Sequence, residues 1–445
     1  MNTTFASCGS LSHLNRRTLL QAAGMSGLCW LTPLAERLAQ AAEKSPKGAP
    51  AHSVIVLWMQ GGPSQLETFD PHPDSSSSVA GGTKRIKTAA KNVYLAEGLP
   101  LVAEQMEHIS LVRSLVSKEG DHERATYNVK TGFRPDPTLV HPSVGAILAH
   151  KTEAADKATV EIPRHVSILP NQWAARGGYL GDQYDAFQTY DPSGPIPDVT
   201  KRVSNERFDR RLSDLDVVEK QFAKSRLKKL DEVKTLHVDS IKRAQKMMSS
   251  DQLKAFDVSQ ASEALRKEFG DTPFGRACLA AIRLIEVGVR CVEVTLDGWD
   301  THANNHSAVA AQNKILDPAF ATLIKELKNC GLLEKTLVLC GGEFGRTPAV
   351  TPGTGGREHW PHGFSIALAG GGIRGGLAIG SNNPSPNFEL KNLADNVRDP
   401  RNIEDIHATV FTALGIDFEE ELLTPIGRPM AISKGKLIKE LLASY

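Results

Sequence analysis

The sequence predicts an α/β fold in which helices cover both faces of a mostly parallel sheet. Six short apolar runs, rich in β-branched residues, recur between residues 54 and 370. The stretches between them space their apolar residues as helices do, and strands that alternate with helices form parallel sheets with two helical layers. A chain of 445 residues is long enough for one large domain of this kind.

The predicted strands are apolar enough to be buried on both faces. They are VIVLWM (54–59), ISLVRSL (109–115), HVSIL (165–169), CVEVTL (291–296), TLVLC (336–340) and FSIALAG (364–370). Residues 74–92 are rich in Gly and Ser, which predicts a loop. Residues 203–270 mix charged and apolar residues at helical spacing, which predicts one or two long amphipathic helices inserted beside the sheet.

The first segment of the chain is predicted to be an export signal. Arg16 and Arg17 precede a moderately apolar stretch, and Ala39-Gln40-Ala41 provides the small residues of a cleavage site. This order is typical of signals read by the twin-arginine export machinery; an uncleaved anchor or a cytosolic amphipathic helix is the alternative. The expected parts are a signal peptide over 1–42, a linker over 43–51 and a periplasmic or extracellular domain over 52–443.

The composition argues against several classes of protein. The formal net charge is only +1 and aromatic residues are 6% of the chain, so a nucleic-acid partner is not expected. After the leader, no run approaches the roughly 20 apolar residues of a membrane span. The four later cysteines are far apart and form no C-x-x-C, which favours buried thiols over a zinc knuckle or a redox motif.

Candidate metal ligands follow the strand CVEVTL. The next residues, DGWDTHANNH, contain Asp297, Asp300 and His302. Because the carboxyl ends of parallel strands meet at one edge of a sheet, ligands gather there. Carboxylate and imidazole together bind zinc, iron or manganese. The alternative is an ordinary loop in which Asp300 caps a helix.

Two further motifs follow the strand TLVLC. GGEFGRTP contains Glu343 and Arg346, and GTGGREHWPHG contains Arg357 and His359. Arginine can hold an anion through two parallel hydrogen bonds, and histidine can bind a metal. The alternative is that Glu343 pairs with Arg346 and that His359 only packs against Trp360.

A third group lies after ISLVRSL, in GDHERATY. Asp121, His122 and Arg124 would stand at the start of a helix, where anions are stabilised. His122 could be a general base, a metal ligand or a nucleophile. Asp121 could simply be the N-cap of the helix.

These motifs together resemble one family. GGPSQLETFDP, GDHERATY, TGFRP, DGWDTH, GGEFGRTP, GREHWPHG and EDIHATVFTALGID occur in the order found in the domain of unknown function 1501 family. The resemblance covers about residues 52–443. That family is grouped with the alkaline phosphatase and sulfatase superfamily, which implies an α/β/α sandwich of three layers with a site of one or two metals.

The resemblance to this superfamily also identifies departures from it. Counting back from the sulfatase-like TGFRP places the nucleophile position on His122, where no Ser, Thr or Cys stands. The first-strand aspartate position falls on Gln60. The paired Asp-His of a later strand becomes Glu343-Phe344.

The resemblance implies one divalent metal, bound by the remaining ligand positions. Its ligands would come from Asp297, Asp300, His302 and His359. His122 or Glu343 would act as the base, and His122 could also replace the nucleophile. Arg124, Arg346 and Arg357 would hold an anionic ester or glycan.

Three functions remain open at this stage, and the third, an iron-dependent oxidoreductase, has no motif specific to it here. The first is an exported metal-dependent hydrolase of phosphate or sulfate esters. The second is a non-catalytic binding protein that keeps the superfamily fold around a degenerate site. Gln60, Phe344 and the missing hydroxyl at position 122 favour the second, whereas the several Asp, Glu, His and Arg residues at successive strand ends favour the first.

Overall fold

A computed structural model describes residues 50–156, 159–224 and 236–443. The predicted signal peptide and most of the predicted linker lie outside these residues.

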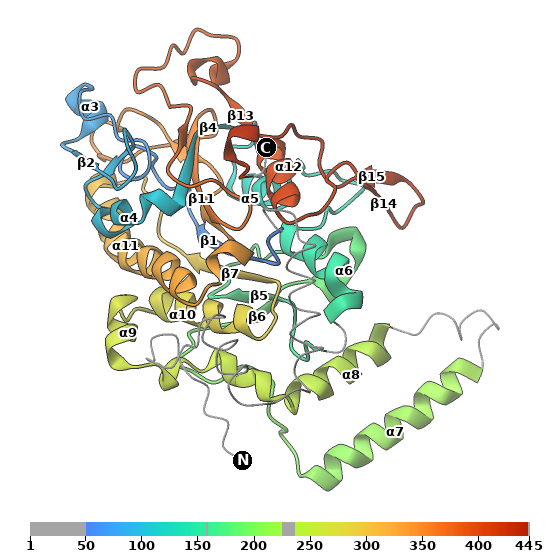
Figure 1. The fold of residues 1–445 in the computed structure, drawn as a ribbon. Helices are drawn as coiled ribbons and strands as arrows, with labels where there is room; N and C mark the ends of the chain where they lie inside the picture. Colours follow the sequence, from blue (N-terminus) through green and yellow to red (C-terminus); the bar gives the residue numbers. More distant parts are fainter. Residues whose placement is uncertain (1–49, 157–158, 225–235, 444–445) are drawn as a thin grey trace, which may run out of the picture.

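A nine-stranded sheet forms the centre of the fold (Figure 1). Its order is β12-β4-β11-β8-β1-β7-β5-β6, with β13 also paired to β4. Only β11 is antiparallel to its neighbours, so the predicted mostly parallel sheet is confirmed. The strands are β1 (Ser53–Met59), β4 (Ile109–Val116), β5 (His165–Ile168), β6 (Phe187–Thr189), β7 (Cys291–Leu296), β8 (Thr336–Gly341), β11 (Phe364–Gly370), β12 (Ala378–Ile379) and β13 (Arg401–Asn402).

Strand β1 shows how the sheet is buried on both faces. Ile55, Leu57 and Met59 belong to the core on one side, and Val54 belongs to the core on the other. Successive side chains of a strand point to opposite faces, so a strand between two helical layers must be apolar throughout. All six predicted strands are present.

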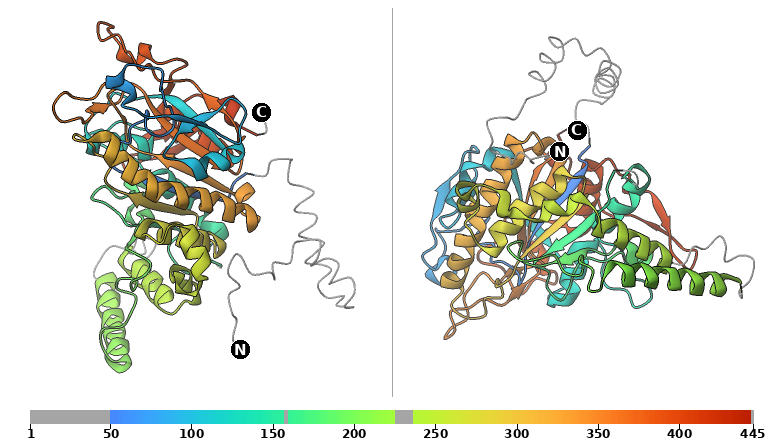
Figure 2. Two further views of the ribbon diagram at one scale, coloured as in Figure 1. Left: turned by 90° about the vertical axis from the view of Figure 1, so that its left-hand side faces the viewer. Right: turned by 90° about the horizontal axis from the view of Figure 1, so that it is seen from below.

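Two layers of helices cover the sheet, and Figure 2 shows them from two further sides. The three-layer α/β/α sandwich is therefore confirmed. One layer contains α4 (Pro100–Glu104), α10 (Pro273–Glu286) and α11 (Asn305–Asn329). The other contains α5 (His122–Thr131), α6 (Val144–Asp156) and α12 (Ile403–Ala413).

The predicted loop over 74–92 is more ordered than its composition indicates. It contains the short helix α3 (Ser77–Ala80) and the strand β2 (Arg85–Lys87), which pairs with β3 (Tyr94–Ala96). Ile86 packs against the core, which explains why a strand forms between Gly- and Ser-rich flanks. Two other small sheets join β9 (Gly345–Arg346) to β10 (His359–Trp360) and β14 (Glu421–Leu423) to β15 (Pro429–Ala431).

The predicted amphipathic segment forms α7 (Asn205–Lys224) and α8 (Leu236–Met248), followed by the short α9 (Glu263–Glu268). In Figure 1, α7 stands away from the sheet. No side chain described over 205–221 is buried, as expected for a solvated helix of mixed charge.

No helix in the described part of the chain has the length and apolar character needed to cross a membrane. Three of the late cysteines, Cys278, Cys291 and Cys340, are buried free thiols.

Candidate metal centre

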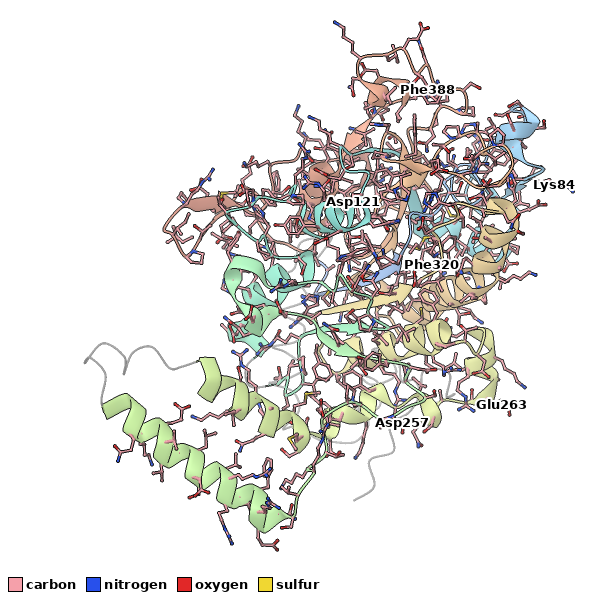
Figure 3. All side chains as sticks on the ribbon, turned by 180° about the vertical axis from the view of Figure 1, so that it is seen from behind. Lys84, Asp121, Asp257, Glu263, Phe320 and Phe388 are labelled. Carbon is pink, nitrogen blue, oxygen red and sulfur yellow. The ribbon has the colours of Figure 1, made fainter. Side chains whose placement is uncertain are left out.

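Side chains from five segments meet at the carboxyl edge of the sheet. Gln60 follows β1, Asp300 follows β7 and Glu343 follows β8. His122 is the first residue of α5, whose N-cap is Asp121, labelled in Figure 3. His359 lies in β10, which pairs with β9 just after β8.

Three of these residues form a group suited to a metal ion. One ligand atom each from His122, Asp300 and His359 lies within 4.8 Å of the others. His302 adjoins the group: its Nε2 is 3.0 Å from Asp300 Oδ1 and 3.1 Å from His359 Nε2. His122 Nε2 is 3.4 Å from Asp300 Oδ2. Asp300, His302 and His359, expected as ligands, are thus brought together, and His122 joins them.

The second ring nitrogen of each histidine fixes its tautomer. Nδ1 of His359 donates to the backbone carbonyl of Gly120 at 2.8 Å. Nδ1 of His122 lies 2.7 Å from Glu343 Oε1, and Nδ1 of His302 lies 2.8 Å from Glu358 Oε2. Carbonyl and carboxylate oxygens only accept, so each Nδ1 carries the proton and each neutral ring has its lone pair on Nε2.

The Nε2 atoms of His122, His302 and His359 therefore place three lone pairs beside the Asp300 carboxylate. Metal-binding histidines typically anchor their other nitrogen in this way, and the donor set suits zinc, iron or manganese. Nε2 of His122 is buried, makes no hydrogen bond of good geometry within the described chain, and has the Asp300 carboxylate at 3.4 Å beside it. The residues fit one divalent ion.

Glu343 holds His122 in place. It is fully buried, and its Oε1 accepts hydrogen bonds from Gln60 Nε2 at 3.1 Å and the Gly61 N–H at 3.0 Å as well as from His122 Nδ1. Its Oε2 is buried and has no hydrogen-bond partner among the described residues. The contacts of Oε1 make Glu343 a positioning residue for His122, and its role as a base stays a prediction.

Gln60 carries an amide that both donates and accepts. Its Nε2 donates to Glu343, and its Oε1 accepts from Trp58 Nε1 at 2.6 Å. A carboxylate at position 60 would place two negative oxygens side by side, and either a proton or a cation would have to offset their repulsion. The amide fills this position without needing either.

The charges of the centre influence one another. Burial opposes protonation of His122, but its hydrogen bond to Glu343 and the charge of Asp300 outweigh burial and raise the pKa of His122. Burial would raise the pKa of Asp300, but the hydrogen bond and charge of Arg346 lower it. Burial lowers the pKa of His359, which favours the neutral ring that a metal requires.

Arg346 serves the centre and is not free to hold an anionic substrate. It is fully buried and donates to the carbonyls of Gly61, Gly62 and Arg357. Its remaining contact is with Asp300 Oδ1 at 2.5 Å. The expected anion-binding role is therefore corrected, since the anion held by Arg346 is Asp300.

Arg357 is also engaged inside the protein. Its guanidinium is fully buried, lies 2.6 Å from Glu67 Oε1, and donates to the carbonyls of Thr347, Pro348 and Val79. These contacts tie the loop before His359 to the loop after β1. The expected substrate contact is replaced by a structural one.

The other two expected residues lie at the surface. Arg124 is exposed and forms two hydrogen bonds with Glu119, which also contacts Arg134. Asp297 is exposed, its Oδ1 accepts from the Gly298 N–H, and it is not part of the metal-ligand group. The sequence left open whether Asp297 or Asp300 is a ligand. The structure places Asp300, and not Asp297, in the ligand group.

Several contributors to the centre were not expected. Glu358 and the Gly120 carbonyl hold two of the imidazoles, although both belong to motifs that were singled out, REHW and GDHER. Trp173 stacks on His122 with ring centroids 6.2 Å apart, and no pattern in the sequence marks it.

A comparison of the sequence with protein families decides the membership of the chain. The family described as "Protein of unknown function (DUF1501)" matches residues 51–442. The chain belongs to the DUF1501 family. The expected family is thereby confirmed over nearly the whole described region.

Solved structures share parts of the architecture of this DUF1501 chain. A sulfatase from Pseudoalteromonas sp. has 14% identity and a TM-score of 0.37, over 86% of this chain and 70% of its own. The alkaline phosphatase of the Antarctic bacterium TAB5 has 14% identity and a TM-score of 0.34, over 74% and 95%. The lipoteichoic acid synthase LtaP from Listeria monocytogenes has 10% identity and a TM-score of 0.37, over 84% and 75%. No curated protein matches the sequence of the DUF1501 chain.

Proposed function

We propose that the chain is an exported, mononuclear metal-dependent hydrolase of phosphate or sulfate esters. The observation that supports this most is the convergence of three Nδ1-anchored imidazoles on the Asp300 carboxylate. A metal held by these residues in a partly open site would let water act as the nucleophile in place of a protein side chain.

The proposed roles follow from the contacts. His122, Asp300 and His359 hold the metal, with His302 as the adjoining ligand. Glu343 and Arg346 orient His122 and Asp300. A divalent ion in this place supplies Lewis-acid chemistry, which withdraws charge from an ester oxygen and lowers the pKa of water.

The centre is open on one side. The side chains of Asp300 and His302 are 47% and 43% exposed, whereas Glu343 on the opposite side is fully buried. An anionic ester or glycan can therefore approach from the side of Asp300 and His302. Since Arg346 and Arg357 are engaged internally, neutralisation of the ester would depend mainly on the metal.

The second candidate is a binding protein that keeps the centre without catalysis. Position 122 carries an imidazole in place of a hydroxyl or thiol, and the buried arginines have no free face for an anion. Such a protein would bind an anionic glycan at the metal without converting it.

One experiment separates the two candidates. The full chain is purified, its metal content is measured by mass spectrometry, and hydrolysis of p-nitrophenyl phosphate, p-nitrophenyl sulfate and sulfated or phosphorylated sugars is compared with that of His359→Ala. Turnover that disappears in the variant supports the hydrolase. Metal binding and glycan binding without turnover support the binding protein, and an absence of metal contradicts both metal-based roles.

A further inference from the structure

A second feature of the molecule lies on the side of the sheet that α5, α6 and α12 cover. It is a cavity of about 70 Å³ whose wall is mainly apolar, including Val56, Leu339, Ile366, Ile406 and Val410. One water molecule needs roughly 10–15 Å³ of such space. The cavity therefore has room for several waters, and because it is partly open, a ligand the size of phenol can enter it and extend beyond it.

Two buried imidazoles in the wall each have one unsatisfied nitrogen. Nδ1 of His165 donates to the Tyr184 carbonyl at 3.0 Å, and Nε2 of His407 donates to the Val129 carbonyl at 2.8 Å. Their other nitrogens, His165 Nε2 and His407 Nδ1, are buried without a partner among the described residues. Because the proton of each ring lies on the other nitrogen, both of these nitrogens are hydrogen-bond acceptors that lack a donor.

Burial keeps these rings neutral. It lowers the pKa of His407 to about 4 and lowers the pKa of His165. Near neutral pH the two nitrogens therefore accept hydrogen bonds and do not donate them.

Gly145 of α6 keeps the nitrogen of His165 uncovered. A Cβ at Gly145 would lie 2.5 Å from His165 Nε2, closer than a side chain can approach. Any other residue would fill the space in front of this acceptor.

The charged groups in the wall already have partners. Lys130 Nζ lies 2.9 Å from Glu293 Oε1 and donates to the Trp173 carbonyl, and its ammonium lies 4.9 Å from the centre of the Trp58 ring. Ser167 also hydrogen-bonds to Glu293. A ligand of this cavity has no free charge to neutralise, so an uncharged molecule fits best.

We propose that this cavity binds a small uncharged molecule with an apolar body and a hydroxyl or N–H donor, and that His165 and His407 accept its hydrogen bonds. The site does not depend on the metal centre. The cavity nevertheless adjoins the metal centre, because Trp58 lines the cavity and donates a hydrogen bond to Gln60, which in turn donates one to Glu343.

The test uses phenol, with toluene as a probe of nearly the same shape that lacks the donor. Binding to the full chain is measured by calorimetry and by thermal unfolding, with and without added zinc. We expect saturable binding of phenol that is about tenfold tighter than binding of toluene, with or without zinc. The preference for phenol should fall to near unity in the double variant His165→Leu, His407→Leu and should persist in His108→Leu, which lies outside the cavity.

A crystal structure of the unmutated chain with 4-bromophenol keeps the test decisive if the double variant does not fold. Bromine signal in the cavity, with the hydroxyl within hydrogen-bond distance of His165 or His407, supports the proposal. Ordered water alone in the cavity, or equal binding of phenol and toluene, overturns it. Because binding is read without turnover, neither result depends on whether the chain hydrolyses esters.

Discussion

The Nε2 atoms of His302 and His359 lie 3.1 Å apart and face each other. Each ring already uses its Nδ1 proton, one on Glu358 and the other on Gly120. Two neutral rings in these tautomers present lone pairs to each other with no proton between them, which is unfavourable. A cation between the two nitrogens removes this conflict, and so would protonation of one ring.

The first prediction concerns metal content. His359→Ala removes a proposed ligand that Gly120 holds in place, so we expect bound metal to fall from about one ion per chain to a small fraction of that. His362→Ala, a change three residues away that leaves the centre intact, should keep the metal. Mass spectrometry of both variants beside the unmutated chain checks this. Equal metal in the two variants would place the ion elsewhere.

The second prediction concerns the groups that orient the ligands. Glu343→Gln weakens the acceptor of His122 Nδ1, and loss of such an outer contact typically lowers metal affinity about 10–100-fold. Competition with a coloured chelator measures the change. Glu97→Gln, at an exposed carboxylate far from the centre, is the control and should bind metal as the unmutated chain does.

The third prediction concerns Gln60. Gln60→Glu places a second carboxylate against Glu343 Oε1, so the metal-free variant should lose about 1–3 kcal/mol of unfolding free energy. Excess zinc should restore more stability in the variant than in the unmutated chain, because a second ion would separate the carboxylates. Denaturation with and without zinc checks both parts. An unchanged stability without metal would mean that the amide hydrogen bond is unimportant.

The fourth prediction separates buried from exposed arginines. Arg346→Met removes one partner of Asp300 and leaves three buried carbonyls without this donor, and should cost about 3 kcal/mol of stability or more. Arg124→Met removes an exposed arginine from Glu119, which keeps Arg134 as a partner, and should cost far less stability. Urea denaturation of the two variants measures the difference. Similar losses in both would contradict the assignment of Arg346 to the interior.

The fifth prediction concerns acid stability. Burial would raise the pKa of Glu67, but contact with His306 and the charge of Arg357 lower it to about 2 from an ordinary value of 4.5. The ionised carboxylate therefore stabilises the fold fully above pH 4.5, and this contribution of about 3 kcal/mol disappears as the pH falls toward 2. Glu67→Gln should be less stable at neutral pH and should show a flatter pH dependence between 4.5 and 2. A variant with the same acid sensitivity as the unmutated chain would disprove the role of Glu67.

The sheet was predictable from the sequence because apolar runs such as β1 and β8 must be buried on both faces wherever they lie. The convergence of Asp300, His302 and His359 followed from strand-end logic and from family resemblance. The roles of the arginines could not be predicted, because they depend on partners far away in the chain. Arg357, for example, pairs with Glu67 across 290 positions, and the sequence alone gives no sign of that pairing. The strand β2 was missed because a single apolar residue, Ile86, fixes it between flexible flanks.

The amide at position 60 also changes the electrical balance of the centre. Asp300, Glu343 and Glu358 contribute three negative charges and Arg346 one positive charge, so one divalent ion would bring the sum to zero. With a carboxylate at position 60 the sum would be one negative charge. The amide therefore lets a single divalent ion neutralise the centre, whereas a carboxylate in its place would leave the pocket repelling an anionic guest.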